Sequence, residues 1–375
     1  MIYLDNAATT KPSRAAVDAM LKSVTDFGNP SSLHGAGLSA EKLIIAAKDN
    51  IAKALGVNSK NIYFTSGGTE ANNLDVLGTA DALKRRGNRV ITSKIEHPSV
   101  LESFKKLEHD GYDVCYIDVN SEGILELEQL SDMLTEDTIL VSVMHVNNET
   151  GVIQPIECIA QLVREKSPNC VIHCDCVQSF GKIPVKPDTM GVDMVSISAH
   201  KIHGLKGTGA LYTKNPKITP MIYGGEQQNE IRPGTENVGG ILAFSAAVSE
   251  CSLDVELMRQ KRRLMRDLLF EKLDDVQING SCEYNSGSVL NVSFIGIKAE
   301  ILLHSLERHE IYVSTGSACS SHKPQPSHVL LAMGVSKNAV DGAIRISFSQ
   351  KITEEEIRFA AERIADEVKN IRRYM

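Results

Sequence analysis

The stretch that decides the fold is Ile139-Leu140-Val141-Ser142-Val143-Met144-His145-Val146, a run that is almost entirely apolar. Similar short apolar runs recur on both sides of it, and amphipathic segments such as 99–109 and 155–166 separate several of them. These runs cover residues 62–64, 90–91, 114–117, 171–172, 194–197 and 210–212. Strands that are apolar along their whole length are typical of a parallel sheet covered by helices on both faces. The alternation from 61 to 214 therefore predicts an α/β fold with a mostly parallel sheet.

The pattern changes after the glycine-rich stretch 224–240. A long helical segment at 254–274 is followed by a strand-like run at 290–294 and a helix near 300–308. A further strand at 343–347 and a last helix at 353–372 complete the chain. This order predicts a smaller α+β unit, with a boundary near residue 250.

Composition narrows the class of protein. The chain has 375 residues, of which 42% are hydrophobic and 23% charged, which is typical of a globular protein large enough to bury a core. Its net charge of −7 makes direct nucleic-acid binding unlikely, because such proteins usually carry a basic surplus. No apolar run approaches the ~18 residues of a membrane span.

The eight cysteines bear on location. The N-terminus, Met1-Ile2-Tyr3-Leu4-Asp5, lacks the apolar segment of a signal peptide. In a chain of this length without an export signal, the cysteines are expected to be reduced thiols in a cytoplasmic protein.

The first motif with chemistry is Ser66-Gly67-Gly68-Thr69-Glu70, which follows an expected strand and opens a helix. Two glycines let the backbone approach an anion closely, and Thr69 adds a hydroxyl donor. An ordinary strand-to-helix turn capped by Thr69 explains the same residues equally well.

The second motif is His173-Cys174-Asp175-Cys176-Val177-Gln178, at the end of an expected strand. A carboxylate at this position projects into the crevice where α/β proteins bind ligands, and it suits a protonated pyridine nitrogen. Zinc is the competing reading, with Cys170 as a further ligand. Successive side chains of a strand point to opposite faces, however, so these residues do not readily close a tetrahedral site. A plain buried strand is the third reading.

The third motif is Ser196-Ile197-Ser198-Ala199-His200-Lys201, which also ends an expected strand. A lysine amine here can form a Schiff base with an aldehyde cofactor, and Ser198 and His200 can bind phosphate beside it. Taken singly, Lys201 reads more simply as a surface lysine.

Together these motifs resemble the cysteine desulfurases, which belong to the class V aminotransferase branch of the fold-type I enzymes that use pyridoxal phosphate (PLP). The resemblance runs from Tyr3-Leu4-Asp5-Asn6-Ala7-Ala8-Thr9-Thr10 to Ile344-Arg345-Ile346-Ser347, nearly the whole chain. It implies a large PLP-binding domain over 15–250 with a mostly parallel, seven-stranded sheet. It also implies a smaller α+β domain, formed by 1–14 and 251–375, that carries a catalytic cysteine loop.

The resemblance also implies roles for individual residues. Lys201 would hold PLP covalently, Asp175 would pair with its ring nitrogen, and His97 would stack on the ring and act as an acid and base. Further contacts to the cofactor are implied for Gly68, Thr69, Asn148, Gln178, Ser198, His200 and Thr235. Thr235 would reach the phosphate of the neighbouring subunit, which implies a homodimer. Arg345, Asn148 and Asn29 would bind the substrate, with Arg345 clamping its carboxylate.

Cys319 decides the reaction within this family. It lies in Ser314-Thr315-Gly316-Ser317-Ala318-Cys319-Ser320-Ser321, among small residues of an expected loop. A sulfur carrier must reach the substrate and then a recipient, and exposure favours thiolate formation. The resemblance therefore implies conversion of L-cysteine to L-alanine, with the sulfur held as a persulfide on Cys319 for an acceptor protein. Cys176 replaces the small alanine usual in the family and is expected to lie against the cofactor.

Other readings make different predictions. A selenocysteine lyase or another class V PLP enzyme would share the motifs, whereas a non-enzymatic thiol or metal relay would use only the cysteines. A dinucleotide-binding module is suggested by Gly35-Ala36-Gly37-Leu38-Ser39-Ala40, but no strand precedes it. Iron–sulfur cluster assembly, tRNA thiolation and DNA phosphorothioation fit equally well as destinations of the sulfur.

Overall fold

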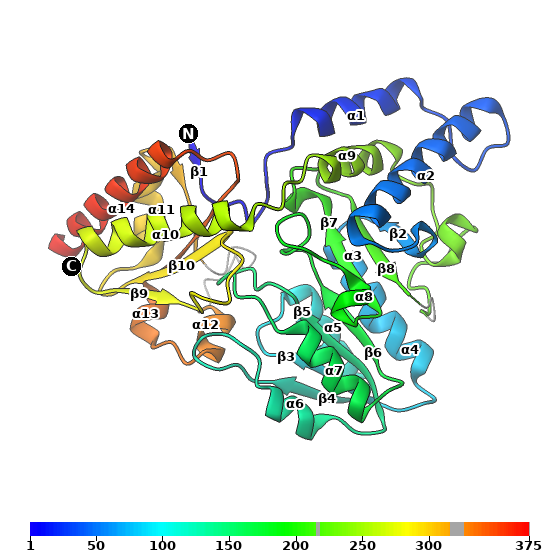
Figure 1. Cartoon of the computed structure of the whole chain (residues 1–375), viewed down its shortest axis with the longest axis horizontal. Coiled ribbons are helices and arrows are strands. Elements are labelled where there is room, and N and C mark those ends of the chain that lie inside the picture. The colour runs from blue at the N-terminus through cyan, green and yellow to red at the C-terminus, as the bar shows by residue number, and fades with distance from the viewer. Residues whose placement is uncertain (215–217, 316–325, 375) are drawn as a thin grey trace.

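The fold is a large α/β sheet with a smaller α+β unit beside it (Figure 1). We describe a computed structural model, covering residues 1–214, 218–315 and 326–374. The sequence-predicted nucleophile Cys319 lies outside these described residues.

The large sheet has seven strands in the order β2-β8-β7-β6-β5-β3-β4. Neighbours are parallel from β7 through to β4, whereas β8 runs antiparallel to both β7 and β2. The fold-class prediction is therefore confirmed, including the seven strands. The strands are β2 (Ile62–Thr65), β3 (Arg89–Ser93), β4 (Asp113–Ile117), β5 (Thr138–Met144), β6 (Val171–Asp175), β7 (Met194–Ser198) and β8 (Gly209–Thr213).

Burial of the central strands explains their composition. All seven residues of β5 are buried, as are all five of β7, because helices cover both faces of the sheet. The covering helices carry an apolar stripe at helical spacing, for example Val100, Phe104 and Leu107 of α5 (Pro98–His109). Helix α7 (Ile156–Lys166) likewise buries Ile156, Ile159 and Val163. The predicted segments 99–109 and 155–166 thus match these helices closely.

Three helices pack together at one side of the large unit: α1 (Arg14–Thr25), α2 (Gly35–Leu55) and α9 (Val238–Ser249) (Figure 1). The G-x-G-x-x-A pattern forms the first turns of α2, and the residues before it make turns and bends rather than a strand. Gly56 ends α2 in the left-handed conformation, with φ of 76°, as a glycine C-cap does. A dinucleotide fingerprint does not fit this context.

The smaller unit contains a four-stranded antiparallel sheet in the order β12-β13-β10-β9. Its strands are β9 (Val276–Asn279), β10 (Val289–Phe294), β12 (Ser314–Thr315) and β13 (Ala343–Ser347). Helices α10 (Val255–Lys272), α11 (Ala299–Glu307) and α14 (Glu354–Tyr374) cover it and share a second hydrophobic core. These elements agree with the α+β pattern predicted after residue 250.

The N-terminus joins the smaller unit. Strand β1 (Ile2–Tyr3) pairs in parallel with β11 (Ile311–Tyr312), and Leu4 is fully buried in the second core. The next residues, Asn6 and Ala7, are held by Ser347 at the end of β13. The chain then crosses to the large unit, so its first ten residues connect the two units.

Among the described residues, no helix combines the length and the apolar character needed to cross a membrane. All seven cysteines in the described part of the chain carry free thiols.

Candidate active site

A cavity of about 870 Å³ opens at the carboxyl ends of β6 and β7, between the two units. This is where ligands bind in α/β sheets. Ten of the sequence-predicted site residues line it: Gly68, Thr69, His97, Asn148, Asp175, Gln178, Ser198, His200, Lys201 and Arg345. They come from segments far apart in the chain, and the fold brings them to a single site.

Asp175 is the acid of the cavity floor, at the end of β6. One carboxylate oxygen accepts the backbone N–H of Val177 at 2.9 Å, and the other accepts the Asn72 amide at 2.8 Å. Only 6% of Asp175 is exposed, so these two donors stabilise a charge that water largely does not reach. The contacts fix the carboxylate at the edge of the cavity.

His97 owes its position to the start of helix α5. It is the N-cap, Pro98 occupies the first helical turn, and the His97 Nδ1 accepts the backbone N–H of Ser99 at 3.1 Å. A neutral imidazole with Nδ1 as acceptor carries its proton on Nε2. Burial lowers the pKa of His97 below its ordinary value, which favours this neutral form.

Lys201 ends the short helix η3 (Ala199–Lys201) that follows β7. Its Nζ donates to the backbone oxygens of Ala7 and Ala8 at 2.6 and 2.8 Å. The N-terminal segment is held there because the backbone oxygen of His200 accepts the Thr10 N–H at 2.9 Å. Burial lowers the pKa of His200 to about 4, and the charge of Lys201 adds to this effect.

Gly68 and Ser198 form an end of the cavity rich in hydroxyl and amide groups. A Cβ on Gly68 would lie 2.6 Å from Val177 and 3.7 Å from the Ser198 side chain, so only glycine fits at this close approach. The Ser198 hydroxyl oxygen is buried and, within the described part of the chain, has no hydrogen-bond partner. Thr69 lines the cavity beside them.

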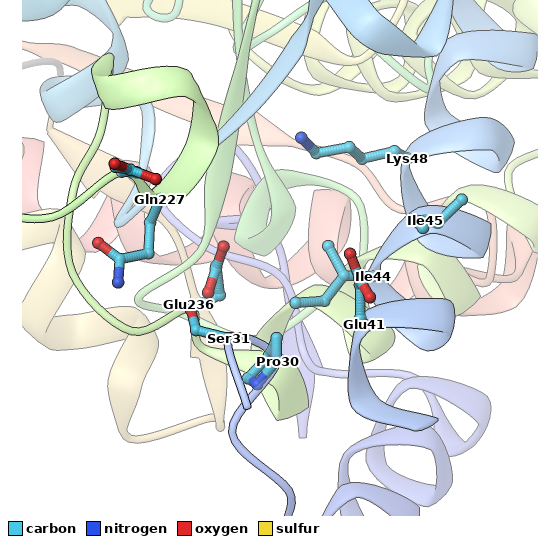
Figure 2. A pocket seen from close by; sticks show the side chains of 9 residues that line it. Pro30, Ser31, Glu41, Ile44, Ile45, Lys48, Gln227 and Glu236 are labelled. Atoms are coloured by element: carbon cyan, nitrogen blue, oxygen red, sulfur yellow. The ribbon is translucent and has the colours of Figure 1, made fainter. Parts of the chain in front are cut away.

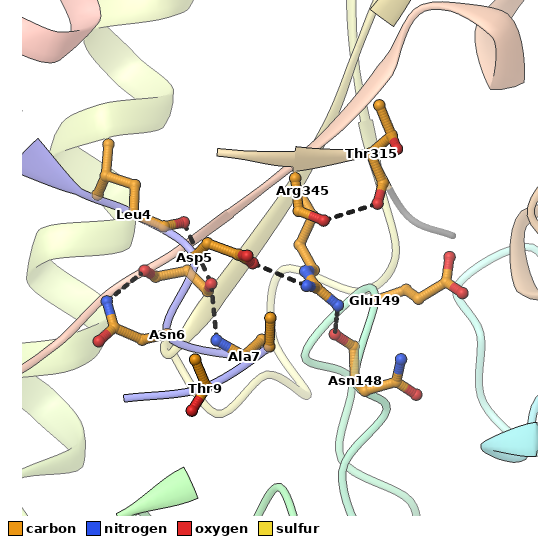
Figure 3. Close-up of polar contacts among 12 residues, drawn as sticks. Leu4, Asp5, Asn6, Ala7, Thr9, Asn148, Glu149, Thr315 and Arg345 are labelled. Carbon is orange, nitrogen blue, oxygen red and sulfur yellow. Dashed lines mark hydrogen bonds and ion pairs between the residues drawn. The ribbon is translucent and has the colours of Figure 1, made fainter. Parts of the chain in front are cut away.

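Arg345 belongs to the smaller unit, on the central part of β13 (Figure 3). Its side chain is buried and its guanidinium donates to Asp5 at 2.9 Å and to the backbone oxygen of Asn148 at 3.1 Å. Within the described residues, its Nε makes no hydrogen bond. Arg345 thus presents a cation to the cavity from the smaller unit.

Asn29 and Thr235 are not among the described residues that line this cavity. Their neighbours Pro30, Ser31 and Glu236 line a second cavity of about 500 Å³, between α2 and the segment after β8 (Figure 2). Lys48 of α2 lies across it from Glu236. The single chain thus places these two predicted residues away from the other ten.

Cys176 does not lie where we expected it, against the cofactor pocket. It is fully buried in the core of the large unit, with its sulfur 3.7 Å from that of Cys174. The reason is the alternation of the strand: Asp175 faces the cavity, so its two neighbours face the other way. His173 is bonded to Ser142 and Ser196 instead of joining the cysteines. Among the described residues no group of three or more His, Cys, Asp or Glu side chains could hold a metal ion.

The segment that contains Cys319 is defined here only by its two flanks. On one side, Thr315 of β12 pairs with Ile344, next to Arg345. On the other side, Pro326, Ser327 and His328 line the cavity, and the Ser327 hydroxyl donates to the buried Glu149 carboxylate. Both flanks of residues 316–325 are therefore fixed at the rim of the same cavity.

Comparison with known proteins agrees with this geometry. Residues 2–359 match the family model described as aminotransferase class-V. The chain is 41% identical to the cysteine desulfurase IscS of Dictyoglomus turgidum over 382 residues, covering 100% of this chain and 96% of the relative. The chain belongs to the cysteine desulfurases of the aminotransferase class-V family.

Solved structures support the same placement among the cysteine desulfurases. A NifS-like protein superposes with a TM-score of 0.91 at 38% identity, covering 97% of this chain and 98% of its own. A structure described as SspA in complex with cysteine superposes with a TM-score of 0.83 at 32% identity, covering 93% and 99%. The resemblance inferred from the motifs is thus confirmed, and the chain is a sulfur-transferring enzyme.

Several residues of the cavity were missed by the sequence analysis. Asn72 bonds both Asp175 and Ser99, and the backbone oxygens of Ala7 and Ala8 hold Lys201. Asn72 lies one turn after the Gly68-Thr69 motif, so its place on the helix was a usable signal. The roles of the Ala7 and Ala8 backbone oxygens could not be predicted, because every residue type has a backbone oxygen.

Proposed function

We propose that this enzyme converts L-cysteine to L-alanine and holds the removed sulfur as a persulfide on Cys319, with PLP as cofactor. The persulfide sulfur then passes to an acceptor protein, for which iron–sulfur cluster assembly and tRNA thiolation are candidate destinations. One observation carries the proposal. Both flanks of the Cys319 segment are anchored at the cavity that also collects Lys201, Asp175 and His97. We also propose a cytoplasmic location, because the reaction needs reduced thiols.

The residues of the cavity fit PLP. An orphaned buried hydroxyl on Ser198, beside the tight approach of Gly68, suits a phosphate, and Thr69 and His200 supply further donors. Asp175 provides a fixed carboxylate for a protonated ring nitrogen, and Lys201 provides the amine that would bind the aldehyde. When bound, the cofactor supplies an electron sink for the negative charge that develops at the substrate Cα.

The remaining cavity groups have roles that follow from their partners. The Gln178 amide donates to the Ala7 oxygen at 2.9 Å and its own oxygen accepts from Lys182, so its second N–H is left for the cofactor ring oxygen. Arg345, from the smaller unit, and Asn148, from the segment after β5, would bind the substrate carboxylate. Lys201 Nζ is placed to take the Cα proton, and His97 Nε2 to supply or remove protons.

The sulfur-transfer step belongs to Cys319. Its thiolate attacks the substrate sulfur, a new S–S bond forms, and the Cβ–S bond breaks with its electron pair left on the carbon skeleton. That skeleton takes up a proton and leaves as alanine, so atoms and electrons balance without an external oxidant. Cys319 is four positions after Thr315, a length over which an extended chain spans at most about 14 Å.

The test compares Cys319→Ala with Cys158→Ala, which removes an exposed thiol on α7. With L-cysteine and PLP, the wild type and Cys158→Ala are expected to form equal amounts of alanine and protein-bound persulfide. Cys319→Ala should bind PLP normally but lose the persulfide and nearly all turnover. PLP binding without alanine formation in the wild type would overturn the substrate assignment, and L-selenocysteine would then be the next substrate to measure.

We further propose that the active unit is a homodimer in which Thr235 completes the neighbouring site. Thr235 lies away from the cavity of its own chain, on an exposed segment. Large apolar side chains are exposed near it and on the α1–α2 connection, including Tyr223 at 82%, Phe27 at 84% and Leu33 at 94%. Apolar groups exposed to this degree mark an association surface.

Complementation distinguishes this arrangement from a site made by one chain. Lys201→Ala and Thr235→Ala proteins are each expected to be impaired, Lys201→Ala severely. Co-expressed as a mixed dimer, they should regain activity, because one of the two sites then carries both native residues. A mixed dimer no more active than Thr235→Ala alone would place Thr235 in its own chain's site or in none.

A further inference from the structure

Beneath the cavity floor lies a buried acid that the proposed chemistry does not use. Asp75 is fully buried in a single π-helical turn, η2 (Leu74–Gly78), which continues α3 (Gly68–Asn73). Such insertions in a helix are uncommon and frequently occur at functional sites. Asn72, which holds Asp175, lies three residues before Asp75 on the same helical segment.

One oxygen of Asp75 has two polar neighbours. The Ser196 hydroxyl donates to Asp75 Oδ2 at 2.9 Å, and His173 Nε2 lies 3.3 Å from the same atom. His173 Nδ1 in turn lies 2.8 Å from the Ser142 hydroxyl. Burial lowers the pKa of His173 to about 3, so its contact with Asp75 is not an ion pair at neutral pH.

The other oxygen of Asp75 raises the question of what its hydrogen-bond partner is. Within the described part of the chain, Asp75 Oδ1 is buried and has no hydrogen-bond partner, and the same holds for the amide oxygen of Asn72. Two acceptors cannot bond each other, and a buried polar atom left unpaired is costly. A proton on Asp75 Oδ1 would supply the missing donor, and the Asn72 side chain is a neighbour of Asp75 because the two lie three residues apart on one helical segment.

Charge supports the same protonation state. Burial raises the pKa of Asp75 well above its ordinary range, and the nearby Asp175 carboxylate raises it further. Asp175 accepts two N–H donors, whereas Asp75 faces a neutral imidazole and a hydroxyl. Of two neighbouring carboxyl groups in such surroundings, the one with weaker partners takes the proton.

We propose that Asp75 is a positioning residue, held as a neutral acid, whose proton orients the Asn72 amide toward Asp175 and Ser99. Asn72 donates to Asp175 at 2.8 Å and to the Ser99 hydroxyl at 2.8 Å, and that hydroxyl lies 2.8 Å from His97 Nδ1. One buried proton therefore orients both the Asp175 carboxylate and the His97 imidazole, two groups that would contact the cofactor. This inference rests on the proposed function, which assigns PLP to the cavity.

Two substitutions distinguish a neutral Asp75 from a charged one. Asp75→Asn preserves the pattern, because an amide oxygen can accept from Ser196 while its N–H donates to Asn72. Asp75→Leu keeps the branching at Cγ but has no polar atoms, so it removes both bonds. Thr79→Val is the control, since Thr79 is 1% exposed, lies one turn further along, and bonds Met194 rather than Asn72.

We would measure the dissociation constant for PLP and the pH midpoint of the visible absorption change of the PLP-bound enzyme. Asp75→Asn and Thr79→Val should stay within about threefold of the wild type in PLP affinity and keep the midpoint. Asp75→Leu should bind PLP about tenfold more weakly, about 1.4 kcal/mol, and shift the midpoint. Equal impairment of Asp75→Asn and Asp75→Leu would overturn the neutral acid. A Leu variant indistinguishable from Thr79→Val would overturn the positioning role.

A second measurement uses no PLP and does not depend on whether the Asp75→Leu protein folds. The infrared difference spectrum of wild type minus Asp75→Asn, both without PLP at neutral pH, should contain the carbonyl band of a neutral carboxylic acid. A carboxylate band in its place would overturn the proposal. A wild type that binds no PLP would instead refute the proposed function, while the infrared result still reports on Asp75.

Discussion

The two walls of the active-site cavity differ in how firmly their polar groups are held. On the large-sheet wall, Asp175, His97 and Lys201 are each held by hydrogen bonds of 2.6–3.1 Å to backbone groups or to the Asn72 amide. On the opposite wall, Arg345 shares its guanidinium between Asp5 and a backbone oxygen, and its Nε bonds no other described group. The difference suggests a preorganised cofactor side facing a substrate side that can exchange partners.

Substitution of Asp175, on the large-sheet wall, should have the largest effect. We expect Asp175→Asn to lower kcat/KM by about 100-fold to 1,000-fold, because the neutral amide cannot stabilise a protonated ring nitrogen. Steady-state kinetics with L-cysteine checks this, with circular dichroism as the control for folding. A loss below tenfold would show that the charge of Asp175 matters little.

Substitution of Arg345, on the wall formed by the smaller unit, should act differently. Arg345→Lys keeps the charge but loses the planar fork, so we expect kcat/KM to fall by about tenfold to 100-fold, mostly through KM. PLP affinity should not change. If kcat fell instead while KM stayed constant, Arg345 would serve the chemical step rather than substrate binding.

The buried Glu96, which precedes His97 on the large-sheet wall, should make the free energy of unfolding depend on pH. Burial raises the pKa of Glu96 to about 8, although Ser93 and the Met144 amide bond its carboxyl group. The folded protein thus keeps a proton that the unfolded chain releases near its ordinary value. Stability is therefore lost as pH rises from about 4.5 to about 8, and changes no further above that.

Glu96→Gln should remove this dependence. We expect its stability relative to the wild type to increase between pH 5 and pH 8, by an amount on the order of 4 kcal/mol at most. Urea unfolding of the PLP-free proteins at both pH values measures it. The exposed Glu271→Gln should show no such trend, and a pH-independent difference for Glu96→Gln would mean that Glu96 ionises normally.

The smallest expected effect concerns the flank of the Cys319 segment. Ser327 caps helix α12 (His328–Ala332) and bonds Glu149, whereas Ser336 caps α13 (Lys337–Asp341) without a contact to any residue lining the cavity in the described structure. Ser327→Ala and Ser336→Ala should each cost about 1 kcal/mol of stability. Only Ser327→Ala should also slow persulfide formation, by a few-fold in single-turnover measurements. Equal rates in both variants would separate this flank from catalysis.

Sequence reasoning succeeded where one motif carries both the local structure and the chemistry. The strands ending at Asp175 and Ser198 were predicted from apolar runs. It failed for Cys176, which was expected at the cofactor and lies in the core. The side to which a residue points depends on the alternation of side chains along the strand. It also missed the Asp75–His173 contact, because two residues 98 positions apart meet only through the order of the strands.

The pairing of β1 with β11 has a consequence for synthesis. The segment that supplies the Ala7 and Ala8 oxygens around Lys201 is held in place by Ser347, which lies 340 positions after Ala7. As the ribosome releases the chain, the large sheet can form well before this last contact becomes available. The lysine pocket is therefore completed only after Ser347 has emerged, so a chain truncated before this residue has no fully formed site.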